Sequence, residues 1–389
     1  MADAPDRGRD RAPGAKPHGR SVAQPGAGAG RDAPAGVLHP VVGRAPAEQV
    51  RLDTSFVEAR LRAPFFTARQ RVDAVRLLYV RVVDAAGRAG HGEAVALDVE
   101  LHVLRDALEA CRPVLAESDG TDREQLIGAC AQAGPHPAAA SAIDMALWDL
   151  AGRRAGEPVW RLLGAADAPV VEVNATIAAA DPGRASSEAA AARETGFRCV
   201  KVKVGLPGDA DRVAAVRAAA GPEMAIRLDA NGAWSVGEAV STLHSLEPLG
   251  VELCEEPTSG SDGIARVSAG TSIPVALDES ASEPGVVDRR VCDAVCLKIA
   301  RWGGISALVE AASRARAAGY RLYLASMLDG PLGIAAALHA ATAARPDLPC
   351  GLATLSLFTG RPEVLPARQG RIRVPDGPGL GLGLSDWYE

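Results

Sequence analysis

Eight short apolar segments, mostly separated by alanine-rich stretches, lie within residues 166–360 and restrict the fold of this chain more than any other feature. They have the length and composition of β-strands, and the stretches between them have helical spacing. The segments are VEVNATI, CVKVKVG, AIRLDAN, ELCEEP, PVALDES, AVCLKIA, RLYLASM and PCGLATL. This pattern predicts an α/β fold, either a TIM-like (β/α)7β barrel or a doubly wound sheet. No GxGxxG motif follows the first strand, so the dinucleotide-binding form of the doubly wound sheet loses support.

The preceding residues, 48–165, have a different pattern. Two segments with strand-like alternation come first, VEARLRAPFF and VRLLYVRVVDAAGRAGHGEAVA, and the second contains a turn at residues 85–87. Three segments with helical spacing follow, DVELHVLRDALEACRPVLAE, DREQLIGACAQA and AAASAIDMALWDLAGRRAG. Strands followed by helices predict a separate α+β domain in front of the alternating region.

Composition limits the classes of partner and compartment. The chain of 389 residues carries a net charge of -6, whereas a nucleic-acid partner would require a basic face. It has no run of about 18 apolar residues, so we expect no membrane-spanning helix. Residues 1–47 are rich in Pro, Gly, Ala and Arg and lack the apolar core of a signal peptide, which predicts a disordered tail. Seven scattered cysteines without a CxxC pair predict a reduced, cytoplasmic protein.

Charged residues stand at or near the ends of five consecutive predicted strands. Along the chain they are Lys203, Asp229, Glu255, Asp278 and Lys298. Neighbours in this series lie 20 to 26 residues apart, which is one strand–helix unit. Because the carboxyl ends of barrel strands surround a single pocket, we expect these side chains to converge. Lys201 lies two residues before Lys203 and therefore shares its face of the strand. A water-exposed edge strand would also explain two lysines, but a barrel has no edge strands.

The three carboxylates predict a metal site. Three acids that converge in an apolar pocket cannot all stay ionised without a cation. Ligands that are all oxygens suit Mg²⁺ first and Mn²⁺ second, so Asp229, Glu255 and Asp278 are the candidate ligands. The alternative interpretation is that these acids form structural ion pairs at the rim of the barrel. One acid in one strand would fit that alternative better than three acids in register.

The strand order also predicts one lysine on each side of the metal. A bound metal polarises a substrate carboxylate and stabilises the enediolate that forms when the α-proton leaves. A lysine beside another cation has a lowered pKa and can act as the base. Lys203 and Lys298 are therefore the candidate acid and base, and Lys201 is expected to support Lys203.

The motifs KVK, DANGAW, EEP, DES and LKIARWGGIS, in this order, resemble those of the enolase superfamily, in its mandelate racemase/muconate lactonizing enzyme subgroup. The resemblance extends over about residues 50–385. It implies an N-terminal capping domain before a barrel, a C-terminal segment (residues 361–389) that returns to the cap, and a homo-oligomer. It also implies a small carboxylate as the substrate.

The same resemblance, carried over position by position, assigns roles to the charged residues. It implies that Asp229, Glu255 and Asp278 hold Mg²⁺. It implies that Lys203 and Lys298 form the acid/base pair of a proton-transfer reaction, with Lys201 beside it.

Within the subgroup, two sets of motifs indicate different reactions. VNATI, LKIARWGGISAL, SMLDGPLGIAA and PDLPCGLAT are similar to o-succinylbenzoate synthases, whereas the long cap with APFFTARQ and GHGEA is similar to dipeptide epimerases, N-acylamino-acid racemases and muconate cycloisomerases. Dipeptide epimerases carry Asp-x-Asp at the last strand, where this chain has LATLS. The first expectation is therefore a cycloisomerase or dehydratase. A racemase or epimerase of N-acyl amino acids or dipeptides is the alternative, and a non-catalytic binding barrel is the alternative from another class.

Further candidates surround the predicted substrate and metal. Asn231 either supports the metal ligands or fixes the turn after its strand. Asp329 either forms a hydrogen bond near the site or caps the next helix. Thr176, in the VNATI segment, is a candidate for contact with the substrate. Phe65, Phe66 and Arg69 lie either on a cap loop over the pocket or, for the two phenylalanines, in the core of the cap.

Overall fold

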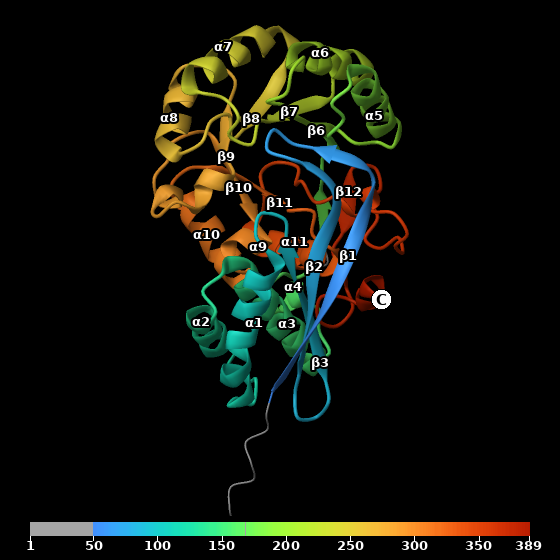
Figure 1. Ribbon diagram of the computed structural model, residues 1–389, viewed down its shortest axis with the longest axis vertical. Coiled ribbons are helices and arrows are strands. Elements are labelled where there is room, and N and C mark those ends of the chain that lie inside the picture. Colours follow the sequence, from blue (N-terminus) through green and yellow to red (C-terminus); the bar gives the residue numbers. More distant parts are fainter. Residues whose placement is uncertain (1–49, 168) are drawn as a thin grey trace, which may run out of the picture. The chain divides into compact units, whose positions relative to one another are not determined.

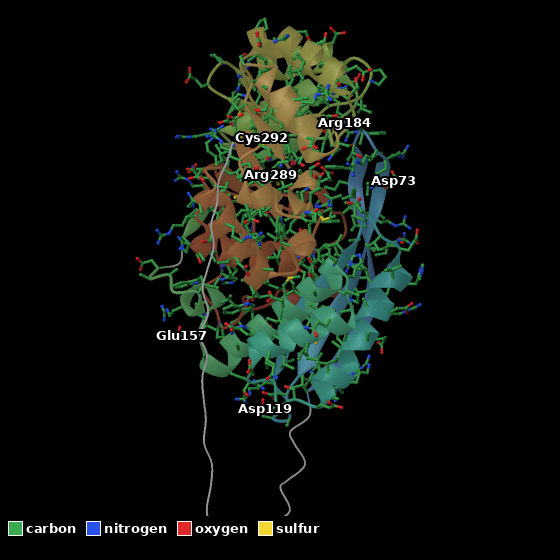
Figure 2. The ribbon with its side chains drawn as sticks, turned by 90° about the vertical axis from the view of Figure 1, so that its left-hand side faces the viewer. Asp73, Asp119, Glu157, Arg184, Arg289 and Cys292 are labelled. Atoms are coloured by element: carbon green, nitrogen blue, oxygen red, sulfur yellow. The ribbon has the colours of Figure 1, made fainter. Side chains whose placement is uncertain are left out.

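The computed structural model describes residues 50–167 and 169–389. The predicted tail, residues 1–47, lies outside the described residues. Charged side chains such as those of Asp73, Asp119 and Arg184 are exposed on the surface, whereas Cys292 is buried (Figure 2). All seven cysteines of the chain are free and buried. In the part of the chain that the structure describes, no helix is both long and apolar enough to cross a membrane.

The predicted N-terminal α+β domain consists of a three-stranded sheet and three helices, which lie side by side in Figure 1. The antiparallel sheet has the order β1-β2-β3, with β1 (Arg51–Phe66), β2 (Arg71–Val83) and β3 (Ala89–Ala96). The helices are α1 (Leu101–Ala116), α2 (Arg123–Ala133) and α3 (Pro137–Ala155), and the short α4 (Val159–Leu162) follows. This confirms the strands and helices expected from the sequence, together with the turn after Asp84, where Gly87 N donates to the Asp84 carbonyl. We call residues 50–165 the cap.

Two glycines set the distance between the sheet and the main helix of the cap. A Cβ atom added at Gly90 or Gly92 would lie 2.0 or 2.1 Å from a backbone carbonyl oxygen of α3. Only glycine therefore permits strand β3 to approach this helix so closely. The contact also explains the alanine-rich sequence of α3, because small side chains allow the close packing that buries almost the whole helix.

The alternating region forms one parallel sheet of seven strands in the order β11-β10-β9-β8-β7-β6-β5. The strands are β5 (Ala175–Ile177), β6 (Cys199–Lys203), β7 (Ala225–Asp229), β8 (Val251–Glu255), β9 (Val275–Leu277), β10 (Ala294–Lys298) and β11 (Arg321–Ala325). The helices between and after them are α5 (Pro182–Glu194), α6 (Asp209–Ala220), α7 (Val236–Leu246), α8 (Ser261–Ala269), α9 (Ile299–Trp302), α10 (Ile305–Ala317) and α11 (Pro331–Ala344). Figure 1 shows α5 to α8 outside strands β6 to β9. The α/β prediction with parallel strands is confirmed.

The first and last predicted strands differ from expectation. VEVNATI is divided between β4 (Val170–Glu172), which pairs antiparallel with β12 (Arg371–Arg373), and β5 of the parallel sheet. PCGLATL forms no strand among the described residues and makes only isolated bridges, Val173↔Cys350 and Ala325↔Gly351. Pro349 has no N–H for a ladder and Gly351 has a low strand propensity, which explains why regular pairing is lost there. The segment nevertheless bridges to Ala325 at the end of β11 and to Val173, two residues before β5.

Strand β6 shows why its lysines are not at a water-exposed edge. It lies between β5 and β7, and all five of its residues are buried. Val200 and Val202 are 0% exposed, and Lys201 and Lys203 on the opposite face are only 5% and 7% exposed. Both faces are covered, so the alternation of valine and lysine separates an apolar face from a charged interior. The edge-strand interpretation is wrong.

The C-terminal residues contact the cap. Arg361 donates to the Glu58 carbonyl at 3.1 Å, and the ring of Tyr388 stacks on that of Tyr79 with centroids 4.9 Å apart. The Tyr388 hydroxyl donates to Glu93 Oε2 on β3 and accepts a hydrogen bond from Leu332 N on α11 at 3.0 Å. Tyr388 therefore joins the cap to the parallel-sheet region.

Glu93 provides a test of this junction. It is 1% exposed, and burial and then the neighbouring Asp329 raise its pKa to about 8. An unfolded glutamate titrates near its ordinary pKa of about 4.3, so the folded state binds more protons between roughly pH 4 and pH 8. The contribution of Glu93 to the free energy of unfolding is therefore expected to be largest below about pH 4. It should fall as the pH rises from about 4 to 8, by at most about 1.4 kcal/mol for each pH unit.

Glu93→Gln, which cannot ionise, is expected to flatten this pH dependence and to be more stable than the unmodified protein above pH 8. Chemical unfolding at pH 5.5 and pH 8.5 would measure the difference. Glu58→Gln, which changes an exposed carboxylate of the same sheet, is the matched control and should leave the pH dependence unchanged. An unaltered slope in Glu93→Gln would contradict the prediction.

Candidate active site

The five charged residues predicted to converge stand together at the carboxyl ends of adjacent strands. Lys203, Asp229, Glu255 and Lys298 are the last residues of β6, β7, β8 and β10, and Asp278 directly follows β9. The register pairs Lys203 with Asp229 and Asp229 with Glu255. The three acids are 0% or 1% exposed and both lysines are 7% exposed. The sequence pattern therefore predicted this convergence correctly.

Each carboxylate of the group contacts an ammonium. Lys203 Nζ lies 2.5 Å from Asp229 Oδ2, and Lys201 Nζ lies 3.0 Å from the same oxygen. Lys201 also lies 3.2 Å from Glu255 Oε1. Lys298 forms an ion pair with Asp278 Oδ2. Lys201 thus bridges two of the acids, which extends its expected role as a support for Lys203.

These contacts shift the pKa values of the group. Burial opposes the charge of Lys298, but the ion pair with Asp278 outweighs burial and raises the pKa of the ammonium above its usual value. The expected lowering of a lysine pKa applies to a lysine beside a bound cation and stays a prediction. Burial and then Asp229 raise the pKa of Glu255 to about 8. Burial also disfavours the charge of Asp229, yet Lys203 and Lys201 hold its pKa below the usual range.

The donor set fits a hard divalent cation. Asp278 Oδ1 is buried and has no hydrogen-bond partner among the described residues, so one carboxylate oxygen is free to bind. Glu255 and Asp278 offer ligand atoms within 4.8 Å of each other and of Cys296 Sγ. Asp229 is not in that compact group, and its Oδ2 contacts two lysines. The three carboxylates supply the oxygen ligands that Mg²⁺ and Mn²⁺ prefer.

Cys296 was not identified from the sequence. It lies two residues before Lys298 on β10, so the period of the strand places both side chains on one face, which is the signal that could have identified it. Burial raises the pKa of Cys296 well above its ordinary value. A thiol that stays protonated is a poor ligand compared with the neighbouring carboxylates.

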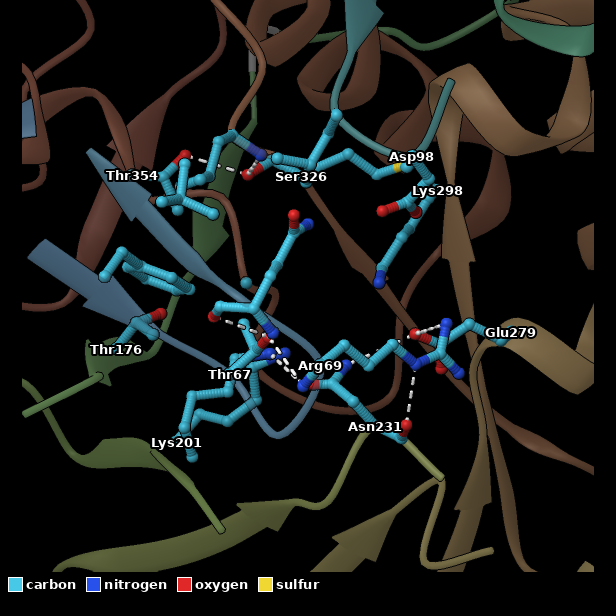
Figure 3. Close-up of a pocket in the computed structure, with 18 of the residues that line it drawn as sticks. Thr67, Arg69, Asp98, Thr176, Lys201, Asn231, Glu279, Lys298, Ser326 and Thr354 are labelled. Atoms are coloured by element: carbon cyan, nitrogen blue, oxygen red, sulfur yellow. Dashed lines mark hydrogen bonds and ion pairs between the residues drawn. The ribbon is translucent and has the colours of Figure 1, made fainter. Parts of the chain in front are cut away.

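A turn of the cap covers one side of the group. Arg69, in the turn between β1 and β2, donates from Nε to the Asn231 carbonyl at 2.9 Å and lies 3.6 Å from Glu279 Oε1 (Figure 3). Asn231 accepts from Lys203 Nζ at 3.0 Å through Oδ1 and donates to Glu279 at 3.2 Å. Asn231 therefore orients Lys203 and also forms the turn after β7, with a φ of 45°. Phe65 lies on β1, is buried in the core and also lines the pocket, so the core interpretation is confirmed and the expected position on a loop is wrong.

Two further candidates, Thr176 and Asp329, lie at different places around the pocket. Thr176 lies on β5 beside Lys201 and lines the pocket. Asp329 is not the N-cap of α11, because Gly330 occupies that position. Its Oδ2 accepts from Met327 N at 3.0 Å, and Met327 lines the pocket. The helix-cap interpretation of Asp329 is therefore wrong, and its hydrogen bond supports the loop beside the site.

Two residues that contact the acids were missed. Tyr323, on β11, donates its hydroxyl to Glu255 Oε2 at 2.6 Å. Glu256 has a φ of 42°, in the left-handed region, and its carboxylate accepts from Asp278 N at 2.7 Å and Ser280 N at 3.0 Å. Glu256 therefore holds the turn that carries Asp278. The second acid of the EEP motif was the available signal for Glu256, and strand alternation was the signal for Tyr323.

The cap and the parallel sheet enclose a pocket above the lysines, with about 710 Å³ of empty space including open solvent at its mouth. Lys201, Lys203 and Lys298 line it from below. The last predicted strand contributes only Gly351 and Thr354, which are neutral. Arg301 lines the pocket and lies 3.4 Å from Asp98 of the cap. The pocket can therefore hold a small anionic molecule against the lysines.

Comparison with known proteins identifies both parts of the chain. Residues 51–164 match the mandelate racemase/muconate lactonizing enzyme N-terminal domain, and residues 184–387 match the family described as enolase C-terminal domain-like. Together these matches include nearly all of the cap, the pocket-lining residues other than Thr176, and all five charged residues.

Three proteins that are similar to this chain carry the names of more than one kind of enzyme. An L-Ala-D/L-Glu epimerase of Clostridium acetobutylicum is 30% identical over 73% of this chain and 84% of its own length. An o-succinylbenzoate synthase of Thermobifida fusca is 37% identical over 55% of this chain and 68% of its own length. The crystal structure of a dipeptide epimerase from Cytophaga hutchinsonii, complexed with Mg and the dipeptide D-Ala-L-Val, has a TM-score of 0.79 at 25% identity and covers 87% of this chain and 98% of that one.

Proposed function

The chain belongs to the mandelate racemase/muconate lactonizing enzyme group of the enolase superfamily, and from this premise we propose that it removes the α-proton of a small carboxylate in a cycloisomerisation or dehydration. The observation that carries the proposal is one lysine on each side of three buried acids at the ends of adjacent strands. Structural ion pairs alone would not require this arrangement to open into a pocket. A barrel that only binds a ligand would also give no reason for the two lysines beside the acids.

We propose that Asp229, Glu255 and Asp278 hold Mg²⁺, with Mn²⁺ as a substitute. When bound, the cation would supply the positive charge that stabilises the substrate carboxylate as its α-proton leaves. The free Asp278 Oδ1 and the all-oxygen donor set support this assignment. A related protein, the dipeptide epimerase of Cytophaga hutchinsonii, was crystallised with Mg.

The side chains of this enzyme then have separate tasks. Lys203 or Lys298 accepts the α-proton at its Nζ, for which that lysine has to be the neutral amine, and the other lysine faces the substrate from the opposite side. Asn231 orients Lys203 through the hydrogen bond to Nζ, and Lys201 balances the charge of Asp229 and Glu255. The Arg69 turn and Phe65 shield the lysines from water, which strengthens the electrostatic interactions inside the pocket.

The neutral end of the pocket favours elimination or cycloisomerisation over epimerisation of a dipeptide. The segment LATLS contributes Thr354 to the pocket and no carboxylate that would hold a free α-ammonium. The identity of 37% with an o-succinylbenzoate synthase supports the same preference. Racemisation of an N-acyl amino acid is the second candidate, because the two lysines flank the acids as an acid/base pair and the relatives include epimerases.

The proposal also concerns the architecture. We propose a (β/α)7β barrel in which residues 349–352 take the position of the eighth strand, supported by the bridge of Gly351 to β11 and by that of Cys350 to Val173, two residues before β5. The proposed divisions are a capping domain at 48–165, the barrel at 166–360 and a C-terminal segment at 361–389. The contacts of Arg361 and Tyr388 with the cap support the last of these.

Incubation of the purified protein in D₂O with N-acyl amino acids, dipeptides and muconate-like acids tests the function. We expect one class of carboxylate to give a new product, followed by NMR, with no racemised starting material. Deuteration at the α-carbon together with inversion of N-acyl amino acids would favour the racemase. Neither exchange nor product across the panel, in the presence of Mg²⁺, would refute proton abstraction from these substrates.

A further inference from the structure

Glu255 is the central acid of the three and is fully buried on β8, between the strands that carry Asp229 and Asp278. Two side chains contact its carboxylate. Lys201 Nζ lies 3.2 Å from Oε1 and 3.4 Å from Oε2, and the Tyr323 hydroxyl lies 2.6 Å from Oε2. The two contacts differ in charge, because one donor is an ammonium and the other is a neutral phenol.

This difference matters when a cation binds. An ammonium beside a divalent cation is repelled, so the contact of Lys201 with Glu255 weakens as the metal approaches. A neutral phenol experiences no such repulsion and can keep its hydrogen bond to one carboxylate oxygen while the other oxygen is free to bind. Among the described residues, Tyr323 is the only neutral side chain that donates to the carboxylate of one of the three acids.

The ring of Tyr323 is itself held firmly. It is 1% exposed, and the guanidinium of Arg227 lies 5.2 Å from its centroid. Arg227 is 0% exposed and is fixed by hydrogen bonds of 2.7 Å to Glu252 on β8 and to the Pro349 carbonyl. A buried cation at this distance stabilises the aromatic ring and limits its movement. The path from Arg227 through Tyr323 to Glu255 therefore lies entirely inside the sheet region.

We propose that Tyr323 is a positioning residue for metal binding, which fixes the orientation of Glu255 through its hydroxyl and is itself held by Arg227. The inference rests on the proposed function, because it assumes that Glu255 is a metal ligand. Partners that orient a ligand typically contribute 10- to 100-fold to metal affinity. Oε2 accepts the Tyr323 hydroxyl, whereas Lys201 Nζ lies within 3.4 Å of both oxygens of the carboxylate.

Tyr323→Phe removes only the hydroxyl and tests the proposal. We expect the Kd for Mn²⁺, measured by electron paramagnetic resonance titration of the chelator-treated protein, to rise by about 10-fold or more. Tyr320→Phe is the matched control. Tyr320 is also buried, but its hydroxyl donates to the Arg289 carbonyl at 2.7 Å and does not contact the acids. We expect the control to bind Mn²⁺ as the unmodified protein does.

Thermal unfolding in excess chelator separates positioning from simple packing. A purely structural hydroxyl would lower the Tm in chelator and leave the Kd unchanged, and that result would overturn the inference. An unmodified protein that binds no Mn²⁺ would instead refute the proposed metal site itself. The two failures are therefore distinguishable.

A second measurement covers the case in which Tyr323→Phe does not fold. The chain has four tyrosines, and fluorotyrosine labelling gives each a ¹⁹F NMR signal. Substitution of Tyr79, Tyr320 and Tyr388 one at a time by phenylalanine assigns the signal of Tyr323 by elimination. We expect Mg²⁺ to shift that signal and to leave the Tyr320 signal in place. A Tyr323 signal that does not respond to saturating Mg²⁺ would contradict the proposal.

Discussion

Lys203→Ala and Lys298→Ala are each expected to lower turnover by about 10²- to 10⁴-fold, because loss of a general acid or base typically has an effect of that size. The two lysines stand at the ends of β6 and β10, separated in the sheet by the three strands that carry or precede the acids. Each lysine can therefore reach a different side of a substrate held between them. Arg314→Ala, which removes an exposed cation from α10, is the control and should retain full turnover.

Solvent exchange in the same variants distinguishes the two proposed chemistries. In a racemase, Lys298→Ala should still exchange the α-proton of one enantiomer through Lys203, and Lys203→Ala that of the other enantiomer. In a synthase or cycloisomerase, this mirror-image pattern should not appear. We expect the second result, since the pocket end formed by Thr354 is neutral. Mirror-image exchange in D₂O, followed by NMR, would replace the first proposal with the racemase.

Stability has to be measured beside turnover. Removing one partner of a buried ion pair typically costs about 3–5 kcal/mol because the other charge stays buried. Asp229 keeps Lys201 when Lys203 is removed, whereas Asp278 has no second ammonium in contact among the described residues. Lys298→Ala is therefore expected to unfold at a lower temperature than Lys203→Ala in chelator. Turnover values are comparable only for variants that remain folded at the assay temperature.

The second large effect that we expect is loss of turnover when divalent cations are removed. Exhaustive chelation should abolish turnover, and added Mg²⁺ or Mn²⁺ should restore it. Asp229→Asn should weaken Mn²⁺ binding by more than the 10- to 100-fold typical of an outer partner, because it removes a formal charge from the metal site itself. Titration of each protein with Mn²⁺ and turnover at saturating metal measure both effects.

Asp288→Asn is the matched control for Asp229→Asn. Asp288 is an exposed carboxylate paired with Arg314, so its substitution changes the net charge equally without touching the site. We expect its metal affinity and turnover to match those of the unmodified protein. Full activity after exhaustive chelation, or an Asp229→Asn variant with normal Mn²⁺ affinity, would exclude Asp229 as a ligand.

The sequence alone determined the side chains that share the interior of the sheet. In a strand the side-chain period is two, so Lys201 and Lys203 had to lie on one face, and Val200 and Val202 on the other. In parallel strands joined by helices, the carboxyl ends lie at the same edge, which brought together charged residues 20 to 26 residues apart. Both rules are local or depend on connectivity, and neither needs the packing of distant segments.

These rules do not predict the structure of the last expected strand. PCGLATL has the apolar composition of a strand, but its backbone makes only two bridges. Whether a segment completes a ladder depends on the hydrogen-bonding groups that its neighbours leave free, and Pro349 and Gly351 make it a poor partner. The division of VEVNATI between two sheets was also decided by a neighbour, because β12 pairs with β4.

Only the tertiary structure decided the contacts that hold the site in place. Arg69 meets Asn231 across 162 residues of sequence, Tyr323 meets Glu255 across 68, and Tyr388 meets Glu93 across 295. No periodicity in the chain relates such pairs. Two of them arise where the cap packs against the sheet or the C-terminal residues, and the third joins β11 to β8 inside the sheet region. The sequence therefore determined which charged groups converge, and the packing of remote segments determined which residues orient and cover them.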